Sequence, residues 1–451
     1  MICLEKIKLF LFNTIIIVIG SIVLRVIGIY FGVYVSNRIG TELVGVFGLV
    51  MSVYMFGITL ATSGINLAST RVISEELALG NTHNINKVTK KCIYISLISG
   101  IVTSFIFYIN CDFIVSKCLH NRIDKTVIYV LCLALPLISM SSAINGYFSA
   151  LRKMYKNVIS QFVEQITRVF VSAFLLSLFL PKSINYACFS LILGDLISEI
   201  ASFLYIYILY VLDAKKNISL PGGTVLVADV SPLAGLSLEK RIFRISIPVA
   251  ITSYLRSGLN TLKQIIIPSS LEKSGLNCAD SFSKYGIINI MCMPIITFPD
   301  VLIRSFSNLL IPEFSRYHVK KDYKSIRKFT LLLLFITSLL SILIALFLYV
   351  FSDNLALMLY KDSSIGLYIK ILALIAPFIY IDSIVDNILR GLDAQVGVMV
   401  INIIDLIFTL SFIYFAVPLL GIKGYIYSIF ISELLNFFIS MFQLIKVVYL
   451  K

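Results

Sequence analysis

Apolar runs of about 20 residues recur along the whole chain, and they constrain its fold more than any other feature. Each run is long enough to cross about 30 Å of hydrocarbon as an α-helix. The sequence is 59% hydrophobic and 14% charged, whereas a soluble domain has about 45–50% apolar and about 25% charged residues. The alternating pattern of an outer-membrane barrel is absent, so the runs predict helices. The chain is therefore expected to be an all-α polytopic membrane protein.

The hydropathy pattern predicts twelve membrane spans. The charged N-terminus, MICLEKIKLFLF, is similar to the start of a signal peptide, but the apolar run after it is too long and no small-residue cleavage site follows. We therefore expect an uncleaved first span. The twelve spans are predicted at residues 9–35, 43–67, 90–110, 126–150, 157–180, 184–212, 241–268, 281–310, 329–351, 365–390, 396–420 and 423–448.

Basic residues between the spans orient the chain. With both termini in the cytoplasm, 23 Lys and Arg residues lie on the cytoplasmic side and 8 lie outside. Such an excess is typical of cytoplasmic loops, so we expect a multi-pass cell-membrane protein with cytoplasmic N- and C-termini. The net charge of +14 then reflects topology and attraction to anionic membrane lipids. Nucleic-acid binding is not expected, because the basic residues are scattered over separate loops.

Cysteine and histidine residues give no support for a metal site or a cofactor. The histidines His83, His120 and His318 are isolated, and the eight cysteines include no C-x-x-C pair. Cys111 and Cys118 share a predicted external loop, where a disulfide could form. Free thiols are favoured, because the sequence has no disulfide framework.

The longest hydrophilic connection falls near the middle of the chain and predicts two lobes. It contains the turn-forming stretch DAKKNISLPGGTVLVADVSPLAG. We expect an N-terminal six-helix lobe at residues 1–212, a cytoplasmic linker at 213–240 and a C-terminal six-helix lobe at 241–451, arranged around a central cleft.

The two halves are similar to each other in sequence. A shift of 241 residues places Glu164 on Asp405, and the similar stretches SEIASF and SELLNF pair Glu199 with Glu433. Six-span repeats have the same orientation in the membrane, and transporters built from repeats bind substrate between them near the midplane. This pattern favours a transporter that works by alternating access.

Acidic residues inside the spans, together with their basic neighbours, form the first group of candidate site residues. Glu164 and Arg168 are spaced i, i+4 and can form an ion pair on one helix face, as can Asp386 and Arg390. Such residues could couple transport to an ion, or they could simply hold helices together. The candidates for coupling or intramembrane pairing are Glu164, Arg168, Glu199, Asp300, Arg304, Asp405 and Glu433.

A second group is cationic and lacks acidic neighbours one turn away. Arg25, Arg256 and Lys263 come from the first span of each half, and Asn260 lies on the same helix face as the last two. A charge at the bilayer centre costs about 2.5–3.5 kcal/mol, so we predict that these four residues line the cleft and bind the substrate. A pyrophosphate head group suits them, because an arginine guanidinium group can donate two parallel hydrogen bonds to a phosphate. Snorkelling, or pairing with carboxylates of other spans, is the alternative.

Five stretches carry a resemblance to a known family: LRVIGIYFG, GLVMSVYMFGITLATSGINLAST, IPVAITSYLRSGLNTLKQIIIPSSLEKSGL, SKYGIINIMCMPIITFPDVLIRSFSNLLIPEFSR and GIKGYIYSIFISELLNFFIS. They resemble the stage V sporulation protein B family, a polysaccharide-biosynthesis branch of the multidrug/oligosaccharidyl-lipid/polysaccharide exporter superfamily that is related to lipid II flippases. The resemblance covers nearly the whole chain. It implies a twelve-helix, two-lobed flippase-like fold and transport of a lipid-linked glycan, often in spore envelope formation.

Individual positions match the family only in part. Arg25 matches an arginine of the wider superfamily. Lipid II flippases have further charged residues just after that motif, where this chain has Phe31 and Gly32. Where relatives often have an aspartate, this chain has Lys263, which makes the predicted cleft more positive.

The leading hypothesis is a flippase of a lipid-linked oligosaccharide or peptidoglycan precursor, in cell-wall or spore-envelope biosynthesis. A cation-coupled multidrug exporter would need a cavity dominated by carboxylates. A non-transporting scaffold that recruits envelope-synthesis enzymes would need an interaction domain, yet the longest loop is short. No catalytic cluster or phosphate-binding loop is present, so an enzyme is not expected. The sequence does not identify the glycan, the coupling ion or the direction of transport.

Overall fold

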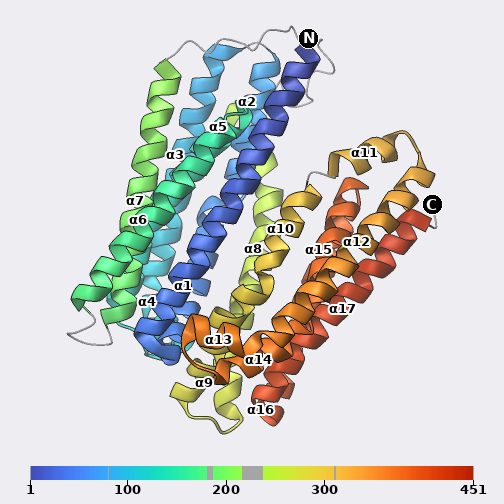
Figure 1. Ribbon diagram of the computed structural model, residues 1–451. Coiled ribbons are helices and arrows are strands. Elements are labelled where there is room, and N and C mark those ends of the chain that lie inside the picture. The colour runs from blue at the N-terminus through green and yellow to red at the C-terminus, as the bar shows by residue number, and fades with distance from the viewer. Residues whose placement is uncertain (1, 80, 180–185, 216–236, 309–310, 450–451) are drawn as a thin grey trace. The chain divides into compact units, whose positions relative to one another are not determined.

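The computed structural model describes residues 2–79, 81–179, 186–215, 237–308 and 311–449. Nearly all of these residues are helical and none forms a strand, which confirms the predicted all-α fold (Figure 1). The helices are α1 (Ile2–Thr62), α2 (Ile65–Ala78), α3 (Thr82–Ile109), α4 (Cys111–Phe113), η1 (Ile114–Cys118), α5 (Lys125–Ala150), α6 (Met154–Phe179), α7 (Tyr186–Lys215), α8 (Leu238–Lys273), α9 (Cys278–Tyr285), η2 (Gly286–Cys292), α10 (Met293–Asn308), α11 (Ile311–Val319), α12 (Tyr323–Val350), α13 (Ser352–Tyr360), α14 (Ser364–Ala373), α15 (Ala376–Gly391), α16 (Gln395–Leu420) and α17 (Ile422–Tyr449).

Within the described residues, nine helices are long and apolar enough to cross a membrane, or ten when the bent pair α14 and α15 is one span. Two features of the helices explain why the count of ten is lower than the predicted twelve spans. The long helix α1 counts once, although Gly40 breaks it with φ 79° and ψ 168°, a backbone conformation that glycine adopts readily. The helix α8 is long enough but too polar to be counted, since it carries Arg241, Arg244, Arg256 and Lys263. Counting α14 and α15 as one span, α1 as two spans and α8 as one more gives twelve.

The helices belong to two compact units. Unit 1 comprises Met1–Gly20 and Val50–Gly258, and unit 2 comprises Ser21–Leu49 and Leu259–Lys451. The helices α1 and α8 therefore each contribute residues to both units.

The predicted lobes at 1–212 and 241–451, and the central cleft between them, stay a prediction. Residues 216–236 of the predicted linker lie outside the part of the chain that the structure describes.

Unit 1 has an apolar core where α2, α3, α5 and α7 meet. Tyr147 and Phe148 of α5 are fully buried in it, and the Tyr147 ring makes an edge contact with Tyr210 at a centroid distance of 5.2 Å. The helices α6 and α7 pack closely at Gly194, which has no Cβ. A Cβ at this position would lie only 2.1 Å from the Ser172 hydroxyl oxygen. Such close packing at a small residue is typical of membrane helices.

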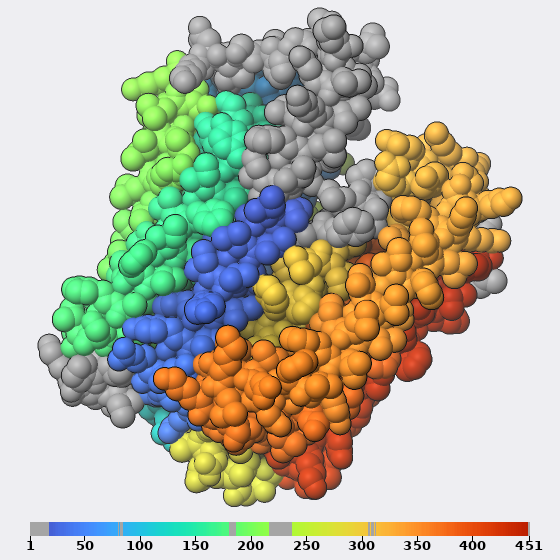
Figure 2. Space-filling view, in the orientation of Figure 1, coloured from blue at the N-terminus to red at the C-terminus, as the bar shows by residue number. Residues whose placement is uncertain are grey.

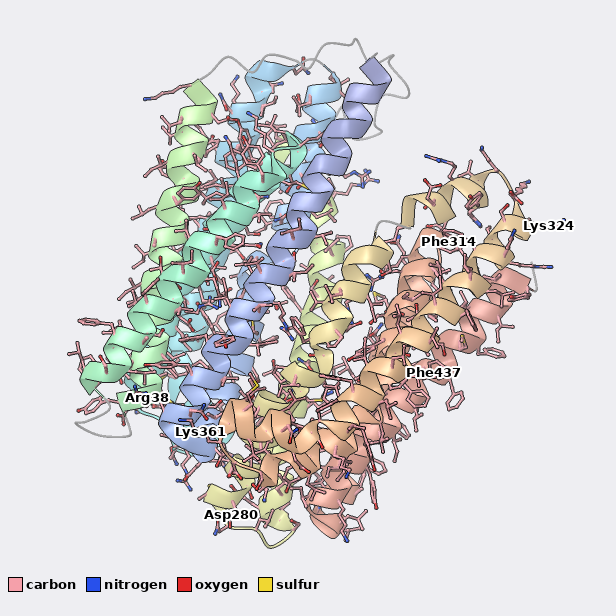
Figure 3. All side chains as sticks on the ribbon, viewed as in Figure 1. Arg38, Asp280, Phe314, Lys324, Lys361 and Phe437 are labelled. Atoms are coloured by element: carbon pink, nitrogen blue, oxygen red, sulfur yellow. The ribbon has the colours of Figure 1, made fainter. Side chains whose placement is uncertain are left out.

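Unit 2 has a second core beneath α11, α12, α15 and α17. Phe314 is fully buried there and contacts Phe329 at a centroid distance of 5.6 Å (Figure 3). In the space-filling view α12 lies at the surface of unit 2 (Figure 2). Its face opposite the core exposes large apolar side chains, including Leu332, Phe335 and Leu339. An apolar exposed face of this kind suits contact with lipid chains.

Glycines let the second half of α1 approach α9 and η2 within unit 2. A Cβ on Gly45 would lie 2.1 Å from the Phe282 carbonyl oxygen, and one on Gly286 would lie 2.6 Å from the Thr41 carbonyl oxygen. The hydroxyl groups of Thr41 and Ser283 form a hydrogen bond of 2.7 Å at the same crossing. The two backbones therefore touch without intervening side chains.

We expect Gly45→Ala to destabilise the protein by about 1–3 kcal/mol, because the added methyl group meets a carbonyl oxygen that cannot move aside. Thermal unfolding in detergent measures the effect. Gly32→Ala on the same helix is the control, since a Cβ there has no neighbour within 4 Å and alanine favours the helix by about 1 kcal/mol. Equal melting temperatures for both variants would contradict the close crossing.

The cysteines of the predicted external loop are free thiols. Cys111 is buried, Cys118 is half-buried, and neither forms a disulfide. Burial raises the pKa of both thiols. The prediction that free thiols are favoured at these positions is therefore confirmed.

Candidate functional site

The unit 1 charge cluster consists of Glu164 and Arg168 on α6 and Asp195 and Glu199 on α7. The Arg168 Nη2 atom lies 2.5 Å from Glu164 Oε1, and its Nε atom lies 2.7 Å from Asp195 Oδ1. Glu199 interacts electrostatically with the other three residues. The predicted i, i+4 pair of Glu164 and Arg168 is present. The Arg168 guanidinium group also forms an ion pair with Asp195, so it joins carboxyl groups of α6 and α7.

Carboxyl groups outnumber basic groups three to one in the unit 1 charge cluster. Asp195 is only 4% exposed, and its Oδ2 atom has no hydrogen-bond partner in the part of the chain that the structure describes. The Tyr54 hydroxyl from α1 is likewise buried without such a partner, and Tyr54 lies within electrostatic range of Glu199. Unpaired buried polar groups are costly, so the cluster is suited to take up a proton or a cation.

The unit 2 cavity is a space of about 70 Å³ between α8, η2, α10, α16 and α17. The polar residues on its walls are Lys263, Gln264, Asn289, Thr409, Tyr425, Ser428, Ser432 and Glu433. Most of them come from segments that are far apart in the sequence. The tertiary fold, rather than any local motif, therefore builds this site.

Hydrogen bonds fix the walls of the unit 2 cavity. Asp405 Oδ1 accepts hydrogen bonds from the Ser432 hydroxyl at 2.7 Å and from the Thr409 hydroxyl at 3.3 Å. Lys263 interacts electrostatically with both Asp405 and Glu433. The cavity thus has two carboxyl groups and one ammonium group in or beside it.

The opposite wall of the unit 2 cavity is held by amides. Gln264 Oε1 accepts hydrogen bonds from the Tyr285 hydroxyl at 2.9 Å and from Asn289 Nδ2 at 2.8 Å. Asn289 lies in the π-helix η2, and π-helical turns in longer helices are frequently found at functional sites.

A further group of polar residues lies on α10, α15 and α17 of unit 2. Asp300 is buried and forms the predicted ion pair with Arg304, whose side chain is 60% exposed. Asp382 accepts a hydrogen bond of 2.7 Å from Asn436. The predicted pair of Asp386 and Arg390 is present as well, at 3.7 Å.

The predicted substrate-binding residues are divided between the units. Arg25 is exposed in unit 2, and its Nη2 atom donates a hydrogen bond of 3.2 Å to the Thr297 hydroxyl. No ion pair of Arg25 occurs within the described ranges. Asn260 and Lys263 also belong to unit 2, whereas the exposed Arg256 belongs to unit 1. A cleft lined by all four side chains stays a prediction.

Several polar partners in these sites were missed by the sequence analysis. Thr297 lies three residues before Asp300, Ser432 directly precedes Glu433, and Thr409 follows Asp405 by one turn. Their position beside predicted charged residues is the only signal in the sequence. Hydroxyl residues are too common inside membrane helices for that signal to be specific.

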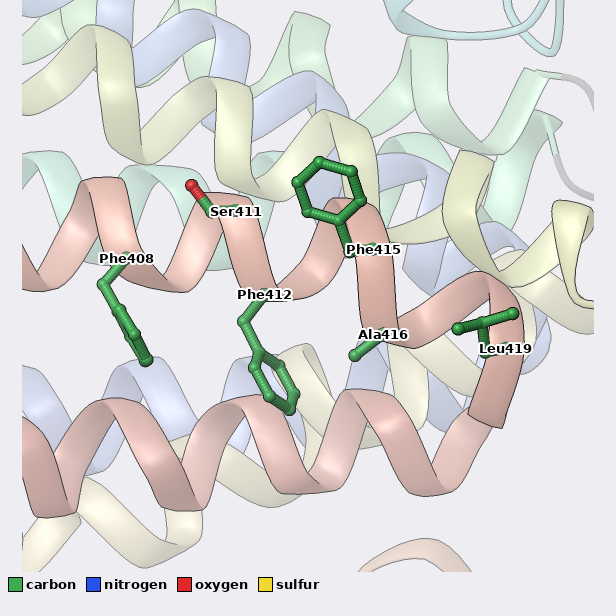
Figure 4. Close-up of a pocket in the computed structure, with 6 residues that line it drawn as sticks. All are labelled: Phe408, Ser411, Phe412, Phe415, Ala416 and Leu419. Atoms are coloured by element: carbon green, nitrogen blue, oxygen red, sulfur yellow. The ribbon is translucent and has the colours of Figure 1, made fainter.

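A separate groove of about 360 Å³ runs along α16, and its walls include Phe408, Phe412, Phe415 and Leu419 (Figure 4). The walls are almost entirely apolar, with Ser411 as the one polar side chain on them. Such a surface suits hydrocarbon chains and offers nothing to an ionic head group.

Comparisons with known proteins agree with this architecture. Residues 10–318 match the family described as polysaccharide biosynthesis protein, and residues 291–415 match the MatE family. The chain is 26% identical over 426 residues to stage V sporulation protein B of Bacillus subtilis (strain 168), covering 92% of this chain and 79% of that protein. It is 23% identical over 335 residues to the lipid II flippase MurJ of the same organism, covering 69% of this chain and 59% of that protein.

Solved structures show the same fold. An inward-facing multidrug resistance MATE family transporter of the MOP superfamily matches with a TM-score of 0.72 and 12% identity, covering 94% of this chain and 95% of that chain. An outward-facing transporter of the same description matches with a TM-score of 0.64 and 15% identity, covering 98% of this chain and 95% of that chain. The helices are therefore arranged as in a MATE-like transporter.

Proposed function

Because the chain belongs to the polysaccharide biosynthesis protein family, we propose that it is a flippase that moves a lipid-linked glycan precursor across the cell membrane. The observation that carries the proposal is the match to this family over residues 10–318 in a chain with the fold of a MOP-superfamily transporter. The similar curated proteins are a sporulation protein and a lipid II flippase. A role in cell-wall or spore-envelope synthesis agrees with both relatives.

The exposed cations of the spans suit the head group of such a substrate. A guanidinium group has five N–H donors, and Arg25 uses one of them on a neutral hydroxyl group. Its remaining donors are available to a pyrophosphate, which arginine binds through two parallel hydrogen bonds. Arg256 and Asn260 are exposed as well. We assign head-group binding to Arg25, Arg256 and Asn260. Lys263, the fourth residue predicted to bind substrate, lies with Glu433 on the wall of the unit 2 cavity.

Flipping can be tested by measuring how much lipid-linked precursor reaches the outer leaflet. Cells that lack related flippases would be compared with and without this protein, using a membrane-impermeant reagent that modifies the exposed glycan. We expect modification to rise several-fold when the protein is present. Equal modification in both strains would overturn the proposal.

A cation-coupled multidrug exporter is the second candidate. The excess of carboxyl groups over cations in the unit 1 charge cluster favours it, since such groups attract cationic drugs and coupling ions. In this case Glu164, Arg168, Glu199, Asp300, Arg304, Asp405 and Glu433 would respond to the coupling ion. Efflux of a lipophilic cationic dye, without any change in precursor exposure, would establish this candidate in place of the flippase.

Cysteine labelling tests the proposed orientation, with cytoplasmic termini. In a variant whose eight native cysteines are replaced, Asp124→Cys should react with an impermeant maleimide from outside, and Ser325→Cys should not. Asp124 is exposed and lies in the loop that the charge pattern predicts to be external. The opposite labelling pattern would reverse the orientation.

A further inference from the structure

The two halves of the sequence have carboxyl groups at equivalent positions. The basic residues near these carboxyl groups lie at positions that are not equivalent. Glu164 corresponds to Asp405, and Glu199 corresponds to Glu433. In unit 1 the cation is Arg168, one turn after Glu164 on the same helix. The shift of 241 residues that relates Glu164 to Asp405 places a neutral residue, Thr409, at the position of Arg168.

In unit 2 the positive charge comes from another helix. Lys263 of α8 lies on the cavity wall together with Glu433, and it acts electrostatically on both Glu433 and Asp405. The other nearby charges are Asp300 and Arg304, which also act on Glu433 but are paired with each other. No ion pair joins Lys263 to either carboxyl group in the part of the chain that the structure describes, so its charge acts across the cavity and not through direct contacts like those of Arg168.

The remaining cavity wall is suited to a cation as well. The Thr409 and Ser432 hydroxyl groups donate hydrogen bonds to Asp405. The lone pairs of their oxygen atoms can still contact a cation. Carboxylate and hydroxyl oxygens are the ligands that small inorganic cations prefer. The cavity of about 70 Å³ has room for about two water molecules at about 30 Å³ each, which is enough for one partly hydrated ion.

We propose that the ammonium group of Lys263 takes the place of a free monovalent cation near Asp405 and Glu433, so that unit 2 carries its own positive charge at this cavity. Removing the ammonium group leaves two carboxyl groups inside the membrane without their cation. Uncompensated charge of this kind is strongly unfavourable, and binding of a free cation would relieve it. This inference depends on the geometry of unit 2 alone, and its test does not use transport.

The test is the response of Lys263→Met to sodium. Methionine keeps the length of the side chain and removes its charge. The melting temperature in detergent would be measured in rising NaCl, with choline chloride keeping the ionic strength constant. A ligand that binds only the folded state raises its stability in a saturable way. We expect sodium to raise the melting temperature of Lys263→Met by several degrees and to leave the wild-type value unchanged.

Two further variants show whether the response comes from this site. Lys263→Met/Glu433→Gln has one carboxyl group fewer and should lose the sodium response. Lys273→Met, on the same helix, removes a lysine that lies over the Tyr414 ring at 5.2 Å and away from the cavity walls, so it should stay insensitive to sodium.

Three results would overturn the proposal. One is a wild-type protein that sodium stabilises as much as it stabilises Lys263→Met, because the site would then hold a free ion beside the lysine. Another is a folded Lys263→Met that does not respond to sodium. The third result concerns a Lys263→Met variant that yields no folded protein with or without sodium. In that case Lys263→Met/Glu433→Gln should restore the yield, and failure to restore it would overturn the proposal.

Discussion

Replacing Arg25 with alanine is expected to reduce glycan transport at least 100-fold while the melting temperature of the protein stays within about 2 °C of the wild-type value. The side chain is exposed, and it donates a hydrogen bond to the Thr297 hydroxyl. Because this partner is neutral, the substitution leaves no carboxylate without its counter-ion, and the large destabilisation of a broken buried ion pair does not arise. Loss of the two-pronged contact with a phosphate would remove several kcal/mol of binding, which explains the size of the transport defect.

Two further variants separate the charge of Arg25 from its geometry. Arg25→Lys keeps the charge but cannot form the bidentate contact, so partial transport is expected. Arg38→Ala is the matched control, because Arg38 lies on the same helix and stacks over the Tyr34 ring at 5.6 Å. It should transport at nearly the wild-type rate. A stable Arg25→Ala variant with full transport would contradict the assigned role, and an unstable one would show that Arg25 is structural.

Replacing Arg168 with alanine is expected to have the largest effect on stability. The substitution removes the shared cation of Glu164 and Asp195, at 2.5 and 2.7 Å, and leaves Asp195 buried with a side chain only 6% exposed. Breaking a buried ion pair on one side costs about 3–5 kcal/mol. We expect a melting temperature in detergent that is lower by many degrees, or a protein that does not accumulate.

Neutral partners should reverse the effect of losing Arg168. In Arg168→Met/Glu164→Gln/Asp195→Asn/Glu199→Gln no carboxyl group of the cluster is left without its cation, and most of the lost stability should return. Arg316→Ala is the control, because its pair with Glu313 is exposed, at 62% and 41%, and exposed pairs contribute about 0–1 kcal/mol. If Arg168→Ala proved as stable as Arg316→Ala, the ion pairs of the unit 1 charge cluster would not be stabilising.

The sequence by itself determined the class of the protein and the interactions within single helices. Apolar runs of membrane-spanning length dictate helices, because the bilayer leaves backbone groups no other partners. The pairs Glu164–Arg168 and Asp300–Arg304 follow directly from the helical repeat, which places side chains four residues apart on one face. Both pairs are present in the structure. The count of spans is less direct. The sequence predicted twelve, whereas length and composition give nine or ten in the described residues, because α1 counts once and α8 is too polar to be counted.

Only the tertiary structure decided which charges meet across helices. The contact of Arg168 with Asp195 joins α6 to α7, and the unit 2 cavity brings Lys263 together with Glu433 across 170 positions of sequence. The sequence analysis assigned Lys263 to substrate binding because no acidic residue lies one turn away on its own helix. Side-chain spacing along a helix fixes its faces, but the partner of each face depends on how helices pack, and that packing is set by shape at small residues such as Gly194 and Gly286.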